Sequence, residues 1–154
     1  GGNYMLNIGP DGQGRVPENN VTILTEIGQW LKINGEAIYG TRPWKISHEG
    51  PFKLEVKGTK DRVNRKINLE ISENDWWFTA KEGCVFAISL ASSSDQVKVI
   101  EEFGLLEIDA LVLVGSNEQL DFTQDKNNVK FKLPEDMKTT NGFTVKAITK
   151  SHQS

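Results

Sequence analysis

The sequence predicts a mainly β protein, an antiparallel β-sandwich preceded by one β-loop-α unit. Two observations lead to this fold class. Apolar residues recur at helical spacing only between residues 17 and 34. After residue 44 the pattern changes to seven or eight short segments, each separated from the next by turn residues, which is typical of a sandwich.

Composition limits the classes of protein to consider. The chain has 154 residues, a size that suits one domain with an appendage. Its net charge is −3, with acidic and basic residues interspersed, which gives no electrostatic hold on nucleic acid or anionic lipid. No apolar run approaches the ~18 residues of a membrane-spanning helix. We therefore expect no nucleic-acid partner and no membrane segment.

The first predicted element is a strand over residues 4–8. It is a nearly continuous apolar run that ends at Gly9 and Pro10, as in a strand buried on both faces of a parallel sheet. Such a strand needs neighbours on both sides, and no second βα unit follows it. We therefore expect this unit to be detached from a larger sheet; the alternative is an edge strand of the later sandwich.

A helix is predicted over residues 17–34. Pro17 suits the first turn of a helix, and Asn34-Gly35 suits its end. Apolar residues mark one side of the helix at positions 21, 24, 27 and 31.

Eight strands are then predicted, at residues 52–56, 75–80, 85–90, 97–102, 106–114, 119–123, 129–133 and 143–149. Residues 81–83 and 124–128 are expected to be hairpin connections. Residues 59–72 are expected to form an irregular loop with at most one poor strand, and residues 151–154 to be frayed.

Few residues suggest chemistry. The two histidines have no metal-ligand spacing around them, so neither a metal nor a cofactor is expected. Cys84 is expected to be a small buried hydrophobe rather than a nucleophile. The carboxylates at positions 101, 102, 109, 135 and 136 are expected on solvated surface, with no catalytic role. The glycine-rich loop over residues 9–14 lacks the end of a P-loop, so phosphate binding is only a weak prediction.

The tryptophans are the more informative residues. Alternation along a strand directs Trp76 and Phe78 into the core and leaves Trp77 more exposed. Trp77 is then either a platform for a sugar ring or a packing surface for an adjoining domain, and packing is favoured. Trp44 follows Pro43 where the helical part meets the strands, so we expect it to wedge the two together.

Two segments carry a family resemblance. The first 44 residues resemble the end of the catalytic domain of α-L-fucosidases of glycoside hydrolase family 29. The later residues 77–81, 85–88 and 111–116 are similar, more loosely, to the family's C-terminal sandwich. The residues that carry the first resemblance are Gly2-Asn3-Tyr4-Met5-Leu6-Asn7-Ile8-Gly9-Pro10-Asp11-Gly12, Pro17 and Ile27-Gly28-Gln29-Trp30-Leu31-Lys32-Ile33-Asn34-Gly35-Glu36-Ala37-Ile38-Tyr39-Gly40-Thr41-Arg42-Pro43-Trp44.

The resemblance implies a function for a longer protein. Family members are retaining exo-glycosidases that remove terminal α-L-fucose, using an Asp nucleophile and a separate acid/base carboxylate on a (β/α)₈-like barrel. Such a barrel needs about 200 or more residues, so it does not fit here. Residues 1–43 are then the C-terminal end of the barrel and residues 44–154 the sandwich. The catalytic carboxylates lie upstream, and this chain alone is expected to be inactive.

The same resemblance suggests partners and sites. The partners are fucosylated glycans, reached through the parent enzyme, and the upstream barrel of the same protein; family habit suggests secretion or the periplasm. Asn7 follows the strand end where barrel enzymes bind substrate, so it either lines the fucose pocket or ties the strand to its neighbour. The alternative function is a stand-alone carbohydrate-binding module that uses Trp77.

Overall fold

The computed structural model describes residues 5–53, 55–57, 66–68, 70–92, 95–135, 137 and 141–150. The predicted frayed end at residues 151–154, like most of the predicted loop at 59–72, lies outside the described residues. Among the described residues, no helix has the length and apolar character needed to cross a bilayer.

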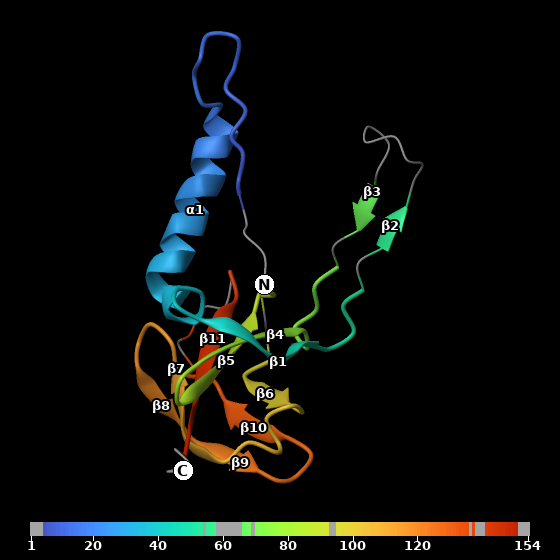
Figure 1. The fold of residues 1–154 in the computed structure, drawn as a ribbon, viewed down its shortest axis with the longest axis vertical. Helices are drawn as coiled ribbons and strands as arrows, with labels where there is room; N and C mark the ends of the chain where they lie inside the picture. Colours follow the sequence, from blue (N-terminus) through green and yellow to red (C-terminus); the bar gives the residue numbers. More distant parts are fainter. Residues whose placement is uncertain are drawn as a thin grey trace.

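The predicted helix is confirmed as α1 (Glu18–Asn34), which follows directly on Pro17. It stands at one end of the molecule against the strands (Figure 1). The helix ends at Asn34, as expected, but Gly35 does not end it with a left-handed backbone conformation. Gly35 has helical backbone angles, and the chain tightens there into a 3₁₀ turn, η1 (Gly35–Ala37). A Cβ atom at this position would lie 2.8 Å from the ring of the exposed Tyr39, so a larger residue would require that ring to shift.

The predicted strand at residues 4–8 is wrong for the part that the structure describes. Residues 5–8 form no strand, and Met5, Leu6 and Ile8 are exposed. An extended segment becomes a strand only when a neighbour takes its backbone hydrogen bonds, and none of the described strands pairs with it.

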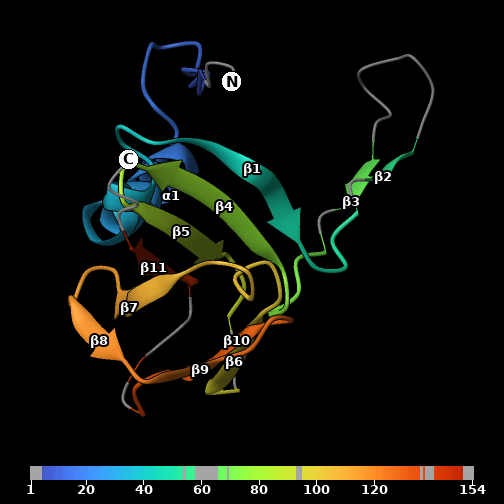
Figure 2. The ribbon, with the colours of Figure 1, turned by 60° about the horizontal axis from the view of Figure 1, so that its bottom comes forward.

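Two antiparallel sheets form the sandwich (Figure 2). The larger has the order β1-β4-β5-β11-β7-β8 and the smaller the order β6-β10-β9. The strands of the larger sheet are β1 (Arg42–Glu49), β4 (Trp76–Lys81), β5 (Cys84–Ser89), β7 (Ile108–Leu113), β8 (Glu118–Leu120) and β11 (Phe143–Thr149). Those of the smaller are β6 (Val97–Ile100), β9 (Phe122–Gln124) and β10 (Val129–Lys132); a further pair, β2 (Glu55–Lys57) and β3 (Lys66–Asn68), projects away from both.

The main core lies between these two sheets, and strand alternation explains its membership. Along β10, Val129 and Phe131 are buried while their neighbours are exposed. Trp76 is buried as predicted, and its indole Nε1 donates a hydrogen bond to the Val99 carbonyl, 3.1 Å away, across to the smaller sheet. The antiparallel sandwich predicted from the sequence is therefore present.

Three strand predictions need correction. Strand β1 was not predicted, because Pro43, its second residue, lacks a backbone N–H and stands at the expected junction between the helix and the strands. The single strand predicted over residues 119–123 is two strands: the chain crosses at Asp121 from β8 in the larger sheet to β9 in the smaller. The strand predicted over residues 52–56 begins only at Glu55 and pairs in the separate β2–β3 ribbon.

Trp44 does not wedge the helix against the strands. It lies in β1 and packs into the main core, with its ring 5.4 Å from that of Phe78 and 6.0 Å from that of Phe103. The prediction was wrong because residue 44 lies within a strand, whose inward positions face the opposite sheet.

Candidate functional site

The C-terminal end of α1 packs on the outer face of the larger sheet, opposite the main core. Because one face of the sheet meets the core and the other meets the helix, every residue of β5 is buried. A second apolar cluster forms at this junction, consisting of Ala37, Cys84, Phe86, Ile88 and Val114, with Trp30 and Trp77 packed against it. Cys84 is therefore a buried strand residue, as expected, and burial raises the pKa of its thiol.

Polar contacts fix the helix end to the sheet. The Glu36 carboxylate accepts hydrogen bonds from Lys81 Nζ and Lys146 Nζ, each at 3.0 Å. The Thr79 hydroxyl donates to the Ala37 carbonyl at 2.6 Å. Partial burial acts to raise the pKa of Glu36, but the two lysines outweigh it and the pKa lies below its ordinary value. The carboxylate is thus ionised at neutral pH and joins η1 to β4 and β11.

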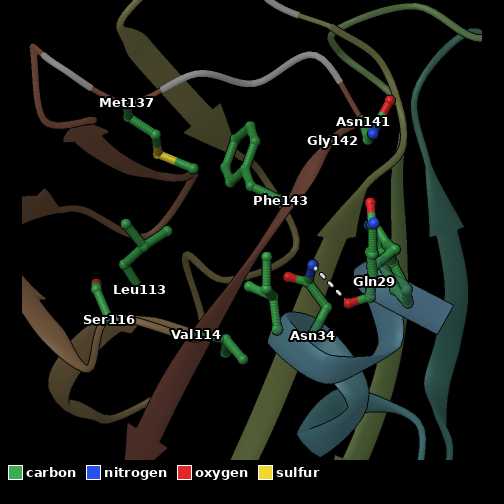
Figure 3. Close-up of a pocket in the computed structure, with 11 residues that line it drawn as sticks. Gln29, Asn34, Leu113, Val114, Ser116, Met137, Asn141, Gly142 and Phe143 are labelled. Carbon is green, nitrogen blue, oxygen red and sulfur yellow. Dashed lines mark hydrogen bonds between the residues drawn. The ribbon is translucent and has the colours of Figure 1, made fainter. Parts of the chain in front are cut away.

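A pocket of about 320 Å³ opens beside this junction, where β7 ends and β11 begins (Figure 3). One wall is the last two turns of α1, and the other is formed by the strand ends and the turn after β7. The described residues that line it are uncharged: Gln29, Trp30, Ile33, Asn34, Leu113, Val114, Ser116, Met137, Asn141, Gly142 and Phe143.

Two polar atoms of the pocket wall are buried without a partner. Within the described chain, neither Trp30 Nε1 nor Asn34 Oδ1 makes a hydrogen bond. The Asn34 side chain is held by one bond only, from its Nδ2 to the Trp30 carbonyl at 3.3 Å, and its oxygen extends away from that bond (Figure 3). The sequence predicted only that Asn34 ends the helix. The structure shows that the strands bury its side chain in the pocket wall and leave its oxygen unpaired.

Trp77 lies in an aromatic group on the same outer face. It is half-buried, with its ring 5.1 Å from His48 and 5.5 Å from Phe52. The sequence correctly placed Trp77 on the opposite face from Trp76 but did not bring His48 and Phe52 to it. These two residues come from β1 and the segment after it, whose positions depend on tertiary contacts.

Asp75 organises the segments around this aromatic group. Its fully buried carboxylate accepts hydrogen bonds from the backbone N–H groups of Phe52 and Ser72, each at 2.7 Å, and lies 3.1 Å from His48 Nε2. Burial acts to raise the pKa of Asp75, but these donors outweigh it and hold the pKa below its ordinary value. Asp75 therefore acts as a hydrogen-bond acceptor that holds these segments together. Its position in the sequence, just before the paired tryptophans, did not predict this role.

Asn7 lies elsewhere. It is exposed and borders a shallow depression of about 150 Å³ against the N-terminal half of α1, together with Leu6, Ile8, Asn20, Ile23 and Leu24. Asn7 and Trp77 share no described pocket, so the structure does not bring the two predicted site residues together.

Several other described carboxylates are exposed or are engaged by backbone N–H groups. Glu101, Asp109 and Glu135 are exposed, as expected, whereas Glu102 is half-buried and Asp136 lies outside the described residues. Glu49 uses both oxygens to accept the backbone N–H groups of Glu101 and Glu102, at 2.8 and 2.9 Å. In the described part of the chain, no three His, Cys, Asp or Glu side chains are grouped to hold a metal ion.

Comparisons with known proteins agree on one family. Residues 1–36 match the family model described as Alpha-L-fucosidase. Alpha-L-fucosidase of Dictyostelium discoideum is 54% identical over 48 residues, which cover 31% of this chain and 10% of that protein. Tissue alpha-L-fucosidase of Homo sapiens is 30% identical over 131 residues, which cover 85% of this chain and 24% of that protein.

A solved structure extends the similarity to nearly the whole chain. The crystal structure of Thermotoga maritima alpha-fucosidase superposes with a TM-score of 0.69 at 25% identity, covering 95% of this chain and 30% of that one. The chain spans about a quarter or less of the length of the two curated relatives named above.

Proposed function

The chain belongs to the α-L-fucosidase family, and from this premise we propose that it is part of a retaining exo-α-L-fucosidase, which hydrolyses terminal α-L-fucose from glycans. In this proposal residues 1–43 belong to a (β/α)₈-like catalytic barrel and residues 44–154 form an accessory sandwich. Retention requires two carboxylates about 5–5.5 Å apart, one as nucleophile and one as acid/base.

The observation that carries the proposal is the apolar surface that α1 exposes within the segment matching the family model. Val21, Ile23 and Ile27 are each two-fifths or more exposed, whereas the C-terminal end of the helix packs on the sheet through Trp30 and Asn34. A helix with apolar residues on several sides is usually covered on several sides. A barrel supplied by the upstream part of a longer protein fits this surface.

The carboxylates of this chain support placing the catalytic pair upstream. Asp75 and Glu36 are engaged by backbone N–H groups and by lysines, and Glu49 caps the turn after β6. A nucleophile or an acid/base must instead be open to substrate. We therefore propose that the isolated chain is inactive and that the sandwich has a structural role, with the Glu36 contacts holding the last barrel helix in place.

An aryl α-L-fucoside assay tests this proposal. The isolated chain is expected to release no aryl alcohol, and a longer protein that carries the barrel upstream of Gly1 is expected to release it. NMR of the first product should show fucose with the anomeric configuration of the substrate. Turnover by the purified 154-residue chain, or a first product of inverted configuration, would contradict the proposal.

The aromatic group supports a second candidate, a carbohydrate-binding module. Its three rings, from Trp77, His48 and Phe52, give a surface on which a sugar could stack. Titration of the chain and of Trp77→Ala with fucosylated glycans tests it. Binding that is lost in the variant supports the module, and equal or absent binding in both proteins excludes it.

A further inference from the structure

The pocket beside α1 contains unsatisfied polar groups. Four buried side-chain N and O atoms in the described chain have no partner: Trp30 Nε1, Asn34 Oδ1, Ser89 Oγ and Thr144 Oγ1. Trp30 and Asn34 line the pocket directly. Ser89 pairs in register with Phe143, another pocket residue, and Thr144 follows Phe143 in β11. Trp30 Nε1 and Asn34 Oδ1 therefore belong to the pocket, whereas Ser89 lies on the main-core face of the larger sheet, the side of its strand neighbour Ala87.

Their geometry presents a donor and an acceptor together. Residues 30 and 34 are one helical turn apart, so their side chains lie on the same side of α1. The indole N–H can only donate, and the Asn34 oxygen can only accept. Buried polar atoms normally find partners, because leaving them unpaired costs stability. Asn34 is only 4% exposed, so its side chain is largely shielded from bulk solvent.

The lining defines the chemistry of an occupant. The described residues that line the pocket are uncharged, which favours a neutral occupant. Leu113, Val114 and Phe143 present apolar surface, while Gln29, Ser116 and Asn141 add neutral amide and hydroxyl groups. A hydroxyl group both donates and accepts, and it matches the Trp30 and Asn34 pair.

We propose that this pocket is a binding site for a neutral, hydroxyl-bearing ligand of the size of one sugar residue. The ligand donates a hydroxyl proton to Asn34 Oδ1, accepts the indole N–H of Trp30, and rests an apolar ring face on the strand ends. This site is separate from the Trp77 group, and it does not depend on hydrolysis by the longer protein.

NMR titration of the 154-residue chain tests the proposal. The chain has four tryptophans, so its indole N–H signals can be assigned with Trp→Phe variants. D-glucose, D-galactose and L-fucose are each added, with cyclohexanol as a ring of similar size that has one hydroxyl. We expect the Trp30 signal to move with at least one sugar, with a dissociation constant of about millimolar, as is usual for a ligand of ~12 heavy atoms. The Trp44 signal, from the main core, should not move.

Two variants separate binding from folding. Asn34→Leu keeps the size of the side chain and removes both the unpaired acceptor and the 3.3 Å hydrogen bond from Nδ2 to the Trp30 carbonyl. These two losses have opposite effects on stability, so the melting temperature should change little, yet the variant should bind the sugar about tenfold more weakly. Trp30→Phe should also weaken binding about tenfold, whereas Trp44→Phe, the matched control, should not.

Three results would overturn the proposal. The first is a Trp30 signal that no sugar moves. The second is an Asn34→Leu variant that binds sugar as well as the unmodified chain does. The third is cyclohexanol binding as tightly as the sugars, which would show a merely apolar cavity.

Discussion

Replacing Asp75 with Asn is expected to destabilise the sandwich more than any exposed carboxylate replacement. The Asp75 carboxylate is fully buried and accepts two backbone N–H groups at 2.7 Å, from Phe52 and Ser72. The amide of Asn has the same shape but only one accepting atom, so one of these N–H groups would face an NH₂ group. Losing one charge-assisted hydrogen bond and burying an unpaired donor costs about 3 kcal/mol in the free energy of unfolding.

The pH dependence provides a second signature of the same contact. The pKa of Asp75 is lowered below its ordinary value of 3.8 in the folded chain. A lowered pKa stabilises the fold at pH values above the unfolded pKa, and this stabilisation is lost as the pH falls through the folded pKa. The difference between the unmodified chain and Asp75→Asn should therefore be constant from about pH 5 to 7 and shrink below about pH 4.

Urea unfolding followed by tryptophan fluorescence measures both effects. Asp109→Asn is the matched control, because Asp109 is an exposed residue of β7. The control should change the free energy of unfolding by less than about 0.5 kcal/mol. If Asp75→Asn is as mild as the control at pH 7, or if its effect does not change on acidification, the structural role assigned to Asp75 is wrong.

Three further predictions follow from single contacts. Gly50→Ala should lower the free energy of unfolding, measured in urea, by at least about 2 kcal/mol, because φ is +116° and the new Cβ would lie 2.6 Å from Asp75 Oδ1. Gly83→Ala is the control: φ is +73°, but nothing lies within 4 Å of the new Cβ, so the loss should be about 1 kcal/mol. Equal losses in the two variants would contradict this reasoning. Glu36→Gln should lower stability by about 0.5–1 kcal/mol at low salt and by less in 1 M NaCl, and a salt-independent loss would argue against the ion pairs. Cys84 is buried, so it should react with a neutral alkylating reagent only when the chain unfolds. Mass spectrometry measures the rate of modification, and fast modification of the native chain would show that the helix–sheet junction is open.

Local patterns were sufficient for much of the fold. Helix α1 was predicted because its apolar residues recur every three to four positions between good terminal residues. The sequence also predicted four strands, β4, β5, β10 and β11, because each is a short stretch of alternating apolar and polar residues bounded by turn residues. The inward direction of Trp76 and Phe78 followed from the same alternation. Each of these features depends on neighbours within a few positions along the chain.

Other features could not be read in this way. Strand β1 forms because β4 provides an edge with which it pairs. Residues 5–8 form no strand because none of the described strands pairs with them. The crossing at Asp121 divides one apparent strand between two sheets. The candidate sites have the same origin: the Trp30 and Asn34 pair becomes a pocket only when β7 and β11 end beside α1, and Trp77 gains His48 and Phe52 only through β1.

The amino-acid order was therefore enough to establish the helix, most of the strands and the family, because these are encoded in spacing and in short motifs that do not need the rest of the molecule. Folding in three dimensions was needed to decide which residues meet across the helix–sheet junction. Those contacts join positions far apart in the chain, such as Glu36 and Lys146, and their energies depend on burial and on partners that no local window contains.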